Sequence, residues 1–140
     1  MLSGDYPCQY YIGRDRNQDT ACQLCRQIAP PHHNTVAEDM THLLTSCRAT
    51  ADTRSKVLPD LLNEISKHFP NNLVLTSTGS NQLTQFILDP TSLNLPMSAR
   101  ISPDHPALPY ILSMCRNYCF AIHKERSRQL VRQYKCVNQQ

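Results

Sequence analysis

The pattern Cys22-x2-Cys25-x16-His42-x4-Cys47 constrains the fold of this 140-residue chain more than any other feature of its sequence. Two cysteines separated by two residues can bind one metal ion, because the tight turn between them aims both sulfurs at a common point. A second pair of ligands from the end of a helix would complete a tetrahedron, with Zn–S distances near ~2.3 Å and Zn–N distances near ~2.0–2.1 Å. We therefore predict one structural Zn²⁺ bound by Cys22, Cys25, His42 and Cys47, with no open position for substrate.

The spacing of the second ligand pair restricts the backbone around it. His42 and Cys47 are five residues apart, which corresponds to about 140° around an ideal α-helix, so they cannot share one face of such a helix. We expect the helix to hold His42 and to end or unwind before Cys47, at Thr45 and Ser46. Three other residues of ligand type remain open as alternatives: Cys8, His32 and His33.

The composition explains why a metal ion would matter for folding. Hydrophobic residues make up 40% of the chain, but Leu, Ile, Val and Phe together make up only about a fifth, close to the ~20% at which chains begin to look disordered. Zinc contributes folding free energy on the order of 10 kcal/mol in isolated finger peptides. Such a contribution can decide whether a chain with a thin core folds.

The cysteine count and the lack of apolar segments bear on the compartment. Seven cysteines are an odd number, which fits poorly with a closed disulfide framework and favours a reducing environment. The first residues lack a charged and then apolar signal pattern, and no run of 18 apolar residues occurs. We expect an intracellular protein, in the nucleus or cytoplasm, that is neither secreted nor inserted in a membrane.

Motifs for catalysis are missing from the sequence. With three glycines, the chain has no G-x-G-x-x-G or Walker pattern, which disfavours nucleotide-binding α/β folds. It also has no Ser-His-Asp set, no carboxylates at catalytic spacing and no H-E-x-x-H. We therefore expect a non-catalytic protein without a small-molecule substrate.

Apolar periodicity predicts an all-α fold, a small irregular helical domain with one CCHC zinc site and a long amphipathic C-terminal helix. Thr35-Val-Ala-Glu38 matches a capping box and predicts a helix start. We expect a zinc-binding module with its following helices over residues 1–69, and a linker, short helix and long helix over 70–140, or one continuous domain. The other expected elements are a helix over 52–69 kinked or broken at Pro59, a helix over 81–88 capped by Ser80, a proline-rich loop over 90–109 and a helix over 107–135.

The long C-terminal helix is predicted to carry an apolar stripe at one end and a basic face at the other. Cys115, Cys119 and His123 recur at intervals of four, which could suggest a second metal site, but the two cysteines lie on the stripe and favour core packing. The stripe comprises Leu108, Ile111, Leu112, Cys115, Tyr118, Cys119 and Ile122. The basic candidates for phosphate contacts are Lys124, Arg128, Arg132 and Lys135 on this helix, and Arg48, Arg54 and Lys56 near the zinc motif.

The run Cys22-x2-Cys25 … Glu38-Asp-Met-Thr-His42-Leu-Leu-Thr-Ser-Cys47 resembles the zinc-binding region that follows the polymerase in non-LTR (LINE-type) retrotransposon reverse transcriptases. That family shows Cys-x2-Cys, an acidic and Thr-containing run, and then His-Leu/Phe-Leu-x-x-Cys. Further similarity lies in Leu2-Ser-Gly4, in Gln85-Phe-Ile-Leu-Asp89-Pro and in His123-Lys-Glu-Arg126-Ser-Arg128. The chain departs from the pattern after Cys25, where Arg26-Gln27 replaces a frequent Gly, and in its long loop to His42.

The resemblance implies a role without polymerase activity, because the family's Tyr/Phe-x-Asp-Asp motif and its endonuclease are missing from this sequence. It implies a zinc-stabilised accessory module that binds template RNA or target DNA through the basic residues named above. The alternative is a zinc-stabilised protein–protein interaction domain that docks through its C-terminal helix. In the family's context, that partner would be the body of the reverse transcriptase.

Overall fold

The computed structural model describes residues 21–28, 36–70 and 79–137 of the chain. Within these ranges the backbone is mostly helical, and pairing of β type is limited to one antiparallel bridge between Ala21 and Ala37. The predicted all-α class is therefore confirmed. Among the residues the structure describes, no helix has the length and apolar character needed to cross a membrane.

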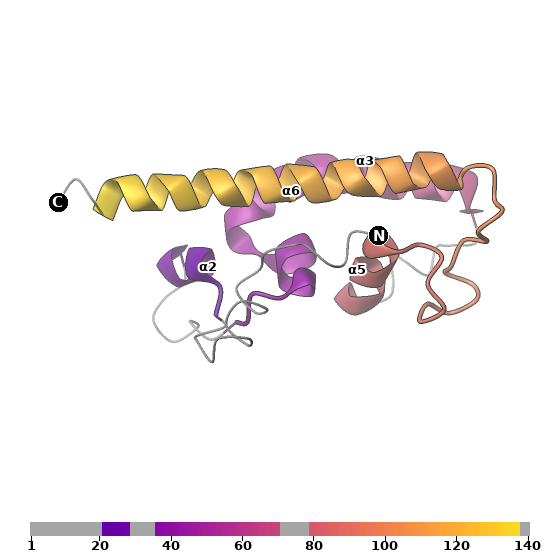
Figure 1. The fold of residues 1–140 in the computed structure, drawn as a ribbon, viewed down its shortest axis with the longest axis horizontal. Helices are drawn as coiled ribbons and strands as arrows, with labels where there is room; N and C mark the ends of the chain where they lie inside the picture. Colours follow the sequence, from indigo (N-terminus) through magenta and orange to yellow (C-terminus); the bar gives the residue numbers. More distant parts are fainter. Residues whose placement is uncertain (1–20, 29–35, 71–78, 138–140) are drawn as a thin grey trace. The chain divides into compact units, whose positions relative to one another are not determined.

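Within the described ranges, six helical elements follow one another (Figure 1). In order they are α2 (Gln23–Ile28), a π-helical turn η2 (His42–Ser46), a 3₁₀ turn η3 (Arg48–Thr50), α3 (Ala51–His68), α5 (Ser80–Leu88) and α6 (Leu108–Val137).

The chain divides into two compact units that cut across the expected boundary between residues 69 and 70. We call the described residues of 55–120 the hydrophobic unit, and the described residues of 21–54 and 121–137 the cysteine unit. Helices α3 and α6 each contribute residues to both units.

The hydrophobic unit has a core of aliphatic and aromatic side chains. Helix α6 as a whole follows the predicted helix over 107–135 closely, and the part of it up to Phe120 belongs to this unit. Its predicted apolar stripe is buried except for Leu112, which is half-buried, and the last stripe residue, Ile122, lies in the cysteine unit. Cys115 and Cys119 lie in this core, as core packing predicted. The core residues are Leu61, Ile65, Phe86, Ile87, Leu95, Ala99, Ile101, Leu108, Ile111, Cys115, Tyr118 and Cys119.

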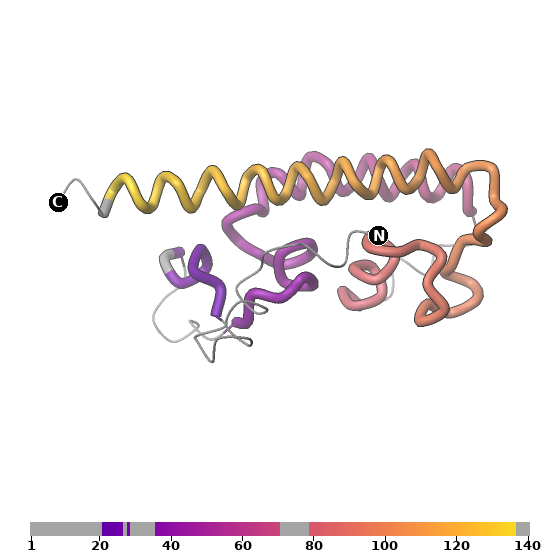
Figure 2. Tube along the Cα trace, in the orientation of Figure 1, coloured from indigo at the N-terminus to yellow at the C-terminus, as the bar shows by residue number. Residues whose placement is uncertain are grey.

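Residues 89–107 form the predicted proline-rich loop, which Figure 2 traces without helical turns. A hydrogen bond from the Ile101 N–H to the Pro90 carbonyl (2.8 Å) closes this loop, and Leu95 and Ala99 are buried inside it. The Ala107 N–H donates to Nδ1 of His105 (3.1 Å), which satisfies a backbone donor just before α6.

Two details of the helices differ from the sequence-based expectations. Helix α3 is continuous through Pro59 and is not broken there. Pro59 has no N–H to donate to the Ser55 carbonyl, and both residues are exposed to solvent. Helix α5 begins at Ser80 with Gly79 as its N-cap residue, and no side chain caps it. Thus Ser80 is the first helical residue rather than the cap.

Candidate metal centre

The first two ligands lie at the start of α2. The Cys22 N–H donates to the Val36 carbonyl (2.9 Å), beside the bridge between Ala21 and Ala37, and the Cys22 carbonyl accepts from the Arg26 N–H (3.2 Å). Cys22 therefore immediately precedes α2, and Cys25 lies in its first turn. Leu24, between them, is fully buried. The Cys-x2-Cys spacing thus forms the entry to a short helix that packs against η3.

The helix that carries His42 begins later than the capping box predicted. Helical backbone starts at Met40, so Glu38 lies outside it, and Thr35 lies outside the described residues. Asp39 provides the cap instead, because its Oδ1 accepts from the His42 N–H (2.7 Å) and its carbonyl accepts from the Leu43 N–H (3.0 Å). The expected capping role of Glu38 is wrong for this reason, and Glu38 has a different partner described below.

A π-helical turn solves the spacing problem between His42 and Cys47. The Cys47 N–H donates to the His42 carbonyl at 2.7 Å, an i→i+5 bond that widens the helix by one residue per turn. This bond places Cys47 above His42, where an α-helical turn would have placed Ser46. The backbone then leaves helical geometry at Cys47, with φ −58° and ψ 123°. The prediction that the helix ends before Cys47 is confirmed, and its last turn is a π-helical turn.

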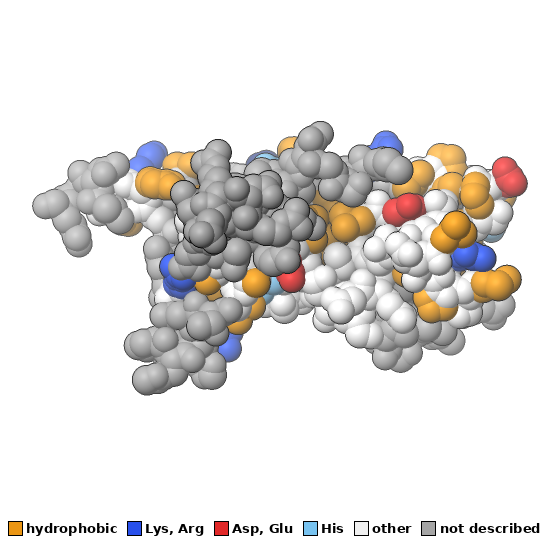
Figure 3. Space-filling model, turned by 60° about the horizontal axis from the view of Figure 1, so that its bottom comes forward, with side chains coloured by type: hydrophobic (Ala, Val, Ile, Leu, Met, Phe, Trp, Pro, Cys, Tyr) orange, Lys and Arg blue, Asp and Glu red, His pale blue; other side chains and the backbone are white. Residues whose placement is uncertain are grey.

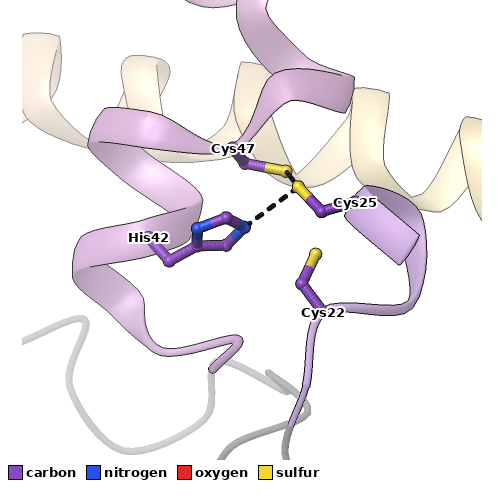
Figure 4. A group of neighbouring side chains, drawn as sticks. All are labelled: Cys22, Cys25, His42 and Cys47. Carbon is purple, nitrogen blue, oxygen red and sulfur yellow. Dashed lines mark hydrogen bonds between the residues drawn. The ribbon is translucent and has the colours of Figure 1, made fainter. Parts of the chain in front are cut away.

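The four ligand side chains converge on one point. Figure 4 shows Cys22, Cys25, His42 and Cys47 pointing toward one another, and all four are buried. Their ligand atoms lie within 4.8 Å of one another. Cys25 Sγ is 3.7 Å from Cys47 Sγ and 3.4 Å from His42 Nε2. In a zinc tetrahedron these separations would be about 3.8 Å and about 3.6 Å, given the usual Zn–S and Zn–N bond lengths.

Backbone donors stabilise negative charge on each sulfur. The N–H groups of Cys25, Arg48 and Ala49 hydrogen bond to the sulfurs of Cys22, Cys25 and Cys47 respectively, and each bond lowers the pKa of the thiol that accepts it. The arrangement is typical of thiolates bound to a metal, because outer contacts orient the ligands and tune their basicity.

Without a cation the three thiols cannot all ionise. Hydrogen bonding from Cys22, supported by His42, lowers the pKa of Cys47 to about 3. The same hydrogen bond, together with burial, raises the pKa of Cys22, and burial above all raises the pKa of Cys25. Burial and the neighbouring Cys47 sulfur thus both disfavour the thiolate forms of Cys22 and Cys25. A bound cation would remove this conflict, since it stabilises several thiolates at once.

Residues outside the ligand set hold it in place. The Cys47 carbonyl accepts from Arg54 Nη1 (2.9 Å) and from Thr50 Oγ1 (3.3 Å), and Ser46 Oγ lies 3.4 Å from His42 Nδ1. The contact at Nδ1 leaves Nε2 directed at the cluster. Sequence reasoning did not assign these supporting roles, because no spacing rule links Thr50 or Arg54 to a carbonyl at residue 47.

A buried ion pair lies in the same unit. Arg126 Nη2 donates to Glu38 Oε1, and both side chains are buried. The pair joins residues far apart in the sequence and ties α6 to the segment just before His42. Arg126 is about 200° from Lys124 around α6, on the side away from the predicted basic face. This position on the helix could have indicated that Arg126 is buried, but nothing in the sequence identified Glu38 as its partner.

The predicted phosphate-binding residues have different surroundings. In the cysteine unit, Lys124, Arg132, Lys135 and Arg48 are exposed, whereas Arg54 is half-buried with its guanidinium on the Cys47 carbonyl. Arg128 is exposed but pairs with Glu125. Lys56 is exposed in the hydrophobic unit.

The remaining ligand candidates divide into two groups. The alternatives Cys8, His32 and His33 lie outside the described residues. Cys115 and Cys119 lie inside them and are buried, and burial raises the pKa of Cys115 to about 12 and that of Cys119 to about 11. Within the described ranges, the Cys22, Cys25, His42 and Cys47 group is the cluster with metal-binding geometry. We call it the Cys₃His cluster.

The fold and the site define a small all-α protein with a buried Cys₃His cluster that can bind a metal ion. Comparison with family models, curated proteins and solved structures found no match to this chain.

Proposed function

We propose that the Cys₃His cluster binds a single Zn²⁺ ion with a structural role. Soft thiolate ligands with one imidazole in a tetrahedral arrangement are the donor set that zinc prefers. Four protein ligands would fill the tetrahedron, so no position is left for a water or a substrate. The observation that carries this proposal is the approach of all four ligand atoms to within 4.8 Å of one another.

We further propose that the chain is a non-catalytic, nucleic-acid-binding accessory module, of the kind that follows the polymerase in LINE-type reverse transcriptases. Two observations support it. The four residues that carry the resemblance to that family converge in space. Exposed cations, among them Lys124, Arg132, Lys135 and Arg48, belong to the same unit as the cluster. Template RNA and target DNA are the ligands that the resemblance implies.

The interaction-domain alternative is the weaker of the two functions. It requires the apolar stripe of α6 as a docking surface, but the stripe residues Leu108, Ile111, Cys115, Tyr118, Cys119 and Ile122 are buried. We therefore place nucleic-acid binding first.

Metal analysis of the purified chain tests the zinc proposal. We expect one zinc ion per chain. Cys47→Ser and His42→Ala should each lose it, because the three remaining protein ligands no longer enclose the ion. Cys115→Ser is the matched control, since it removes a buried thiol from the hydrophobic unit and should keep the metal. Equal zinc content in Cys47→Ser and Cys115→Ser would refute the assignment of the ligands.

Salt-dependent binding tests the nucleic-acid proposal. We expect the logarithm of the affinity for RNA or DNA to fall with the logarithm of salt concentration, with a slope of about −0.7 to −0.9 per neutralised phosphate. Lys124→Glu and Arg132→Glu should weaken binding and reduce the slope. Lys67→Glu, a charge-matched change in the hydrophobic unit, should do neither. Affinity that does not respond to salt would exclude phosphate contacts.

A further inference from the structure

One exposed surface in the cysteine unit combines cationic and apolar side chains. Helical geometry places six residues of α6 within about 160° of arc. The opposite side of the helix packs against the rest of the cysteine unit. There Arg126 pairs with Glu38, and Leu130 contacts the buried group Cys22, Leu24, Cys25 and Cys47. We call the six residues the α6 outer face: Lys124, Arg128, Val131, Arg132, Tyr134 and Lys135.

The positive charges of the α6 outer face are not equally available. Glu125 accepts from Arg128 Nε (2.8 Å) and Nη2 (2.7 Å), so this arginine is held by a carboxylate on its own helix. In the part of the chain that the structure describes, Lys124 and Lys135 form no such ion pair. They lie eleven residues apart and nearly in line along the helix, about 16 Å from each other.

Two apolar side chains lie among these cations and face the solvent. Tyr134 is 67% exposed and Val131 is 54% exposed. Figure 3 shows blue Lys or Arg side chains beside orange hydrophobic ones where α6 ends. A membrane-binding helix would need a broad apolar face, and the α6 outer face offers one valine and one tyrosine. An exposed aromatic ring among cations matches instead the stacking and phosphate contacts that single strands receive.

We propose that the α6 outer face binds single-stranded nucleic acid, with Tyr134 stacking on a base and Lys124 and Lys135 contacting phosphates on either side of Val131. Single strands fit better than duplexes, because an unpaired base can present its flat face to the tyrosine ring. The proposal rests on the proposed function, since it specifies which form of nucleic acid the module binds and where.

Because Arg128 is paired with Glu125, we predict an order in which variants of this surface change the affinity for nucleic acid. Lys124→Ala and Lys135→Ala each remove a cation that forms no ion pair with another described residue. Each should weaken binding more than Arg128→Ala does. Glu125→Gln should tighten binding, because it frees the Arg128 guanidinium and removes a negative charge from the same side of the helix. A merely structural role for this pair would give the opposite sign.

The test is fluorescence anisotropy with a labelled 12-nucleotide RNA strand, the same sequence as a duplex, and vesicles of anionic phospholipid. We expect the strand to bind more tightly than the duplex or the vesicles. Tyr134→Ala should weaken strand binding by roughly five- to a hundredfold, whereas Tyr134→Phe should retain it, since stacking does not need the hydroxyl. Lys67→Ala removes one positive charge from the hydrophobic unit and is the control for Lys124→Ala and Lys135→Ala. Circular dichroism verifies that each variant is folded.

The possible outcomes distinguish a failure of this inference from a failure of the proposed function. Salt-dependent binding with equal affinity for strand and duplex, unchanged in Tyr134→Ala, overturns the inference and leaves the proposed function in place. Lack of salt-dependent binding to strand and duplex, with both the RNA and the DNA of the same sequence, overturns both. Binding to the vesicles alone also overturns both and assigns the surface to lipid.

Discussion

The two units of this chain are built from different kinds of interaction. The core of the hydrophobic unit consists of aliphatic and aromatic side chains such as Phe86, Ile87 and Ile111. The cysteine unit buries fewer aliphatic groups, and it buries them around the Cys₃His cluster and the Glu38–Arg126 pair. They are chiefly Leu24, Leu43, Leu44 and Ile122. One unit therefore depends mainly on the area of apolar surface it buries, and the other on a few polar groups in defined positions.

This difference predicts different responses to damage. Hydrophobic stabilisation is non-directional and roughly proportional to area, so the loss of one methyl group costs a fraction of the total. A tetrahedral metal site and a buried ion pair depend on every member being present, because a remaining buried charge has no compensation. Loss of one member should therefore unfold the whole cysteine unit, whereas loss of one apolar group should lower the stability of the hydrophobic unit only slightly.

Metal removal should give the largest difference between the units. Structural zinc contributes apparent free energies of about 10–16 kcal/mol in finger peptides at pH 7, so a strong chelator should unfold the cysteine unit. Hydrogen exchange would show loss of amide protection at Leu43 and Leu44, with protection retained at Ile87 and Ile111. Chelator saturated with zinc is the control. Equal loss of protection in both units would show that they do not differ in their need for metal.

Breaking the buried ion pair should have the next largest effect. Glu38→Gln leaves Arg126 buried without its carboxylate, and such changes cost about 3–5 kcal/mol. Urea unfolding monitored in the cysteine unit would measure the loss. The double variant Glu38→Leu, Arg126→Met removes both charges and should be less destabilised than the single one. If the double variant loses as much as the sum of its two single changes, the two side chains are not coupled.

A small core deletion in the hydrophobic unit should have the smallest effect. Ile111→Val removes one buried methylene and should lower the free energy of unfolding by about 0.5–1.5 kcal/mol. Because Ile111 lies outside the cysteine unit, the zinc content should stay the same. Denaturant unfolding and metal analysis of one preparation provide both values. Loss of zinc from this variant would contradict the separation of the two units.

Local pattern was sufficient to predict much of the helical structure. The apolar spacing of residues 107–135 predicted α6 closely, because a helix of that length repeats its signal many times. Helix starts were less predictable, as Asp39 and Gly79 show. Several nearby residues can satisfy the first free N–H groups of a helix, so the choice of cap depends on the path of the preceding chain.

Sequence by itself determined which four residues form the Cys₃His cluster, and it determined the helical character of the fold. Both follow from spacing along the chain, which residue types and helical periodicity specify directly. Tertiary structure alone decided the π turn that aligns His42 with Cys47, the partnership of Glu38 with Arg126, and the coverage of the α6 stripe. These features depend on which distant segments meet, and no local pattern encodes the burial that selects one partner over another.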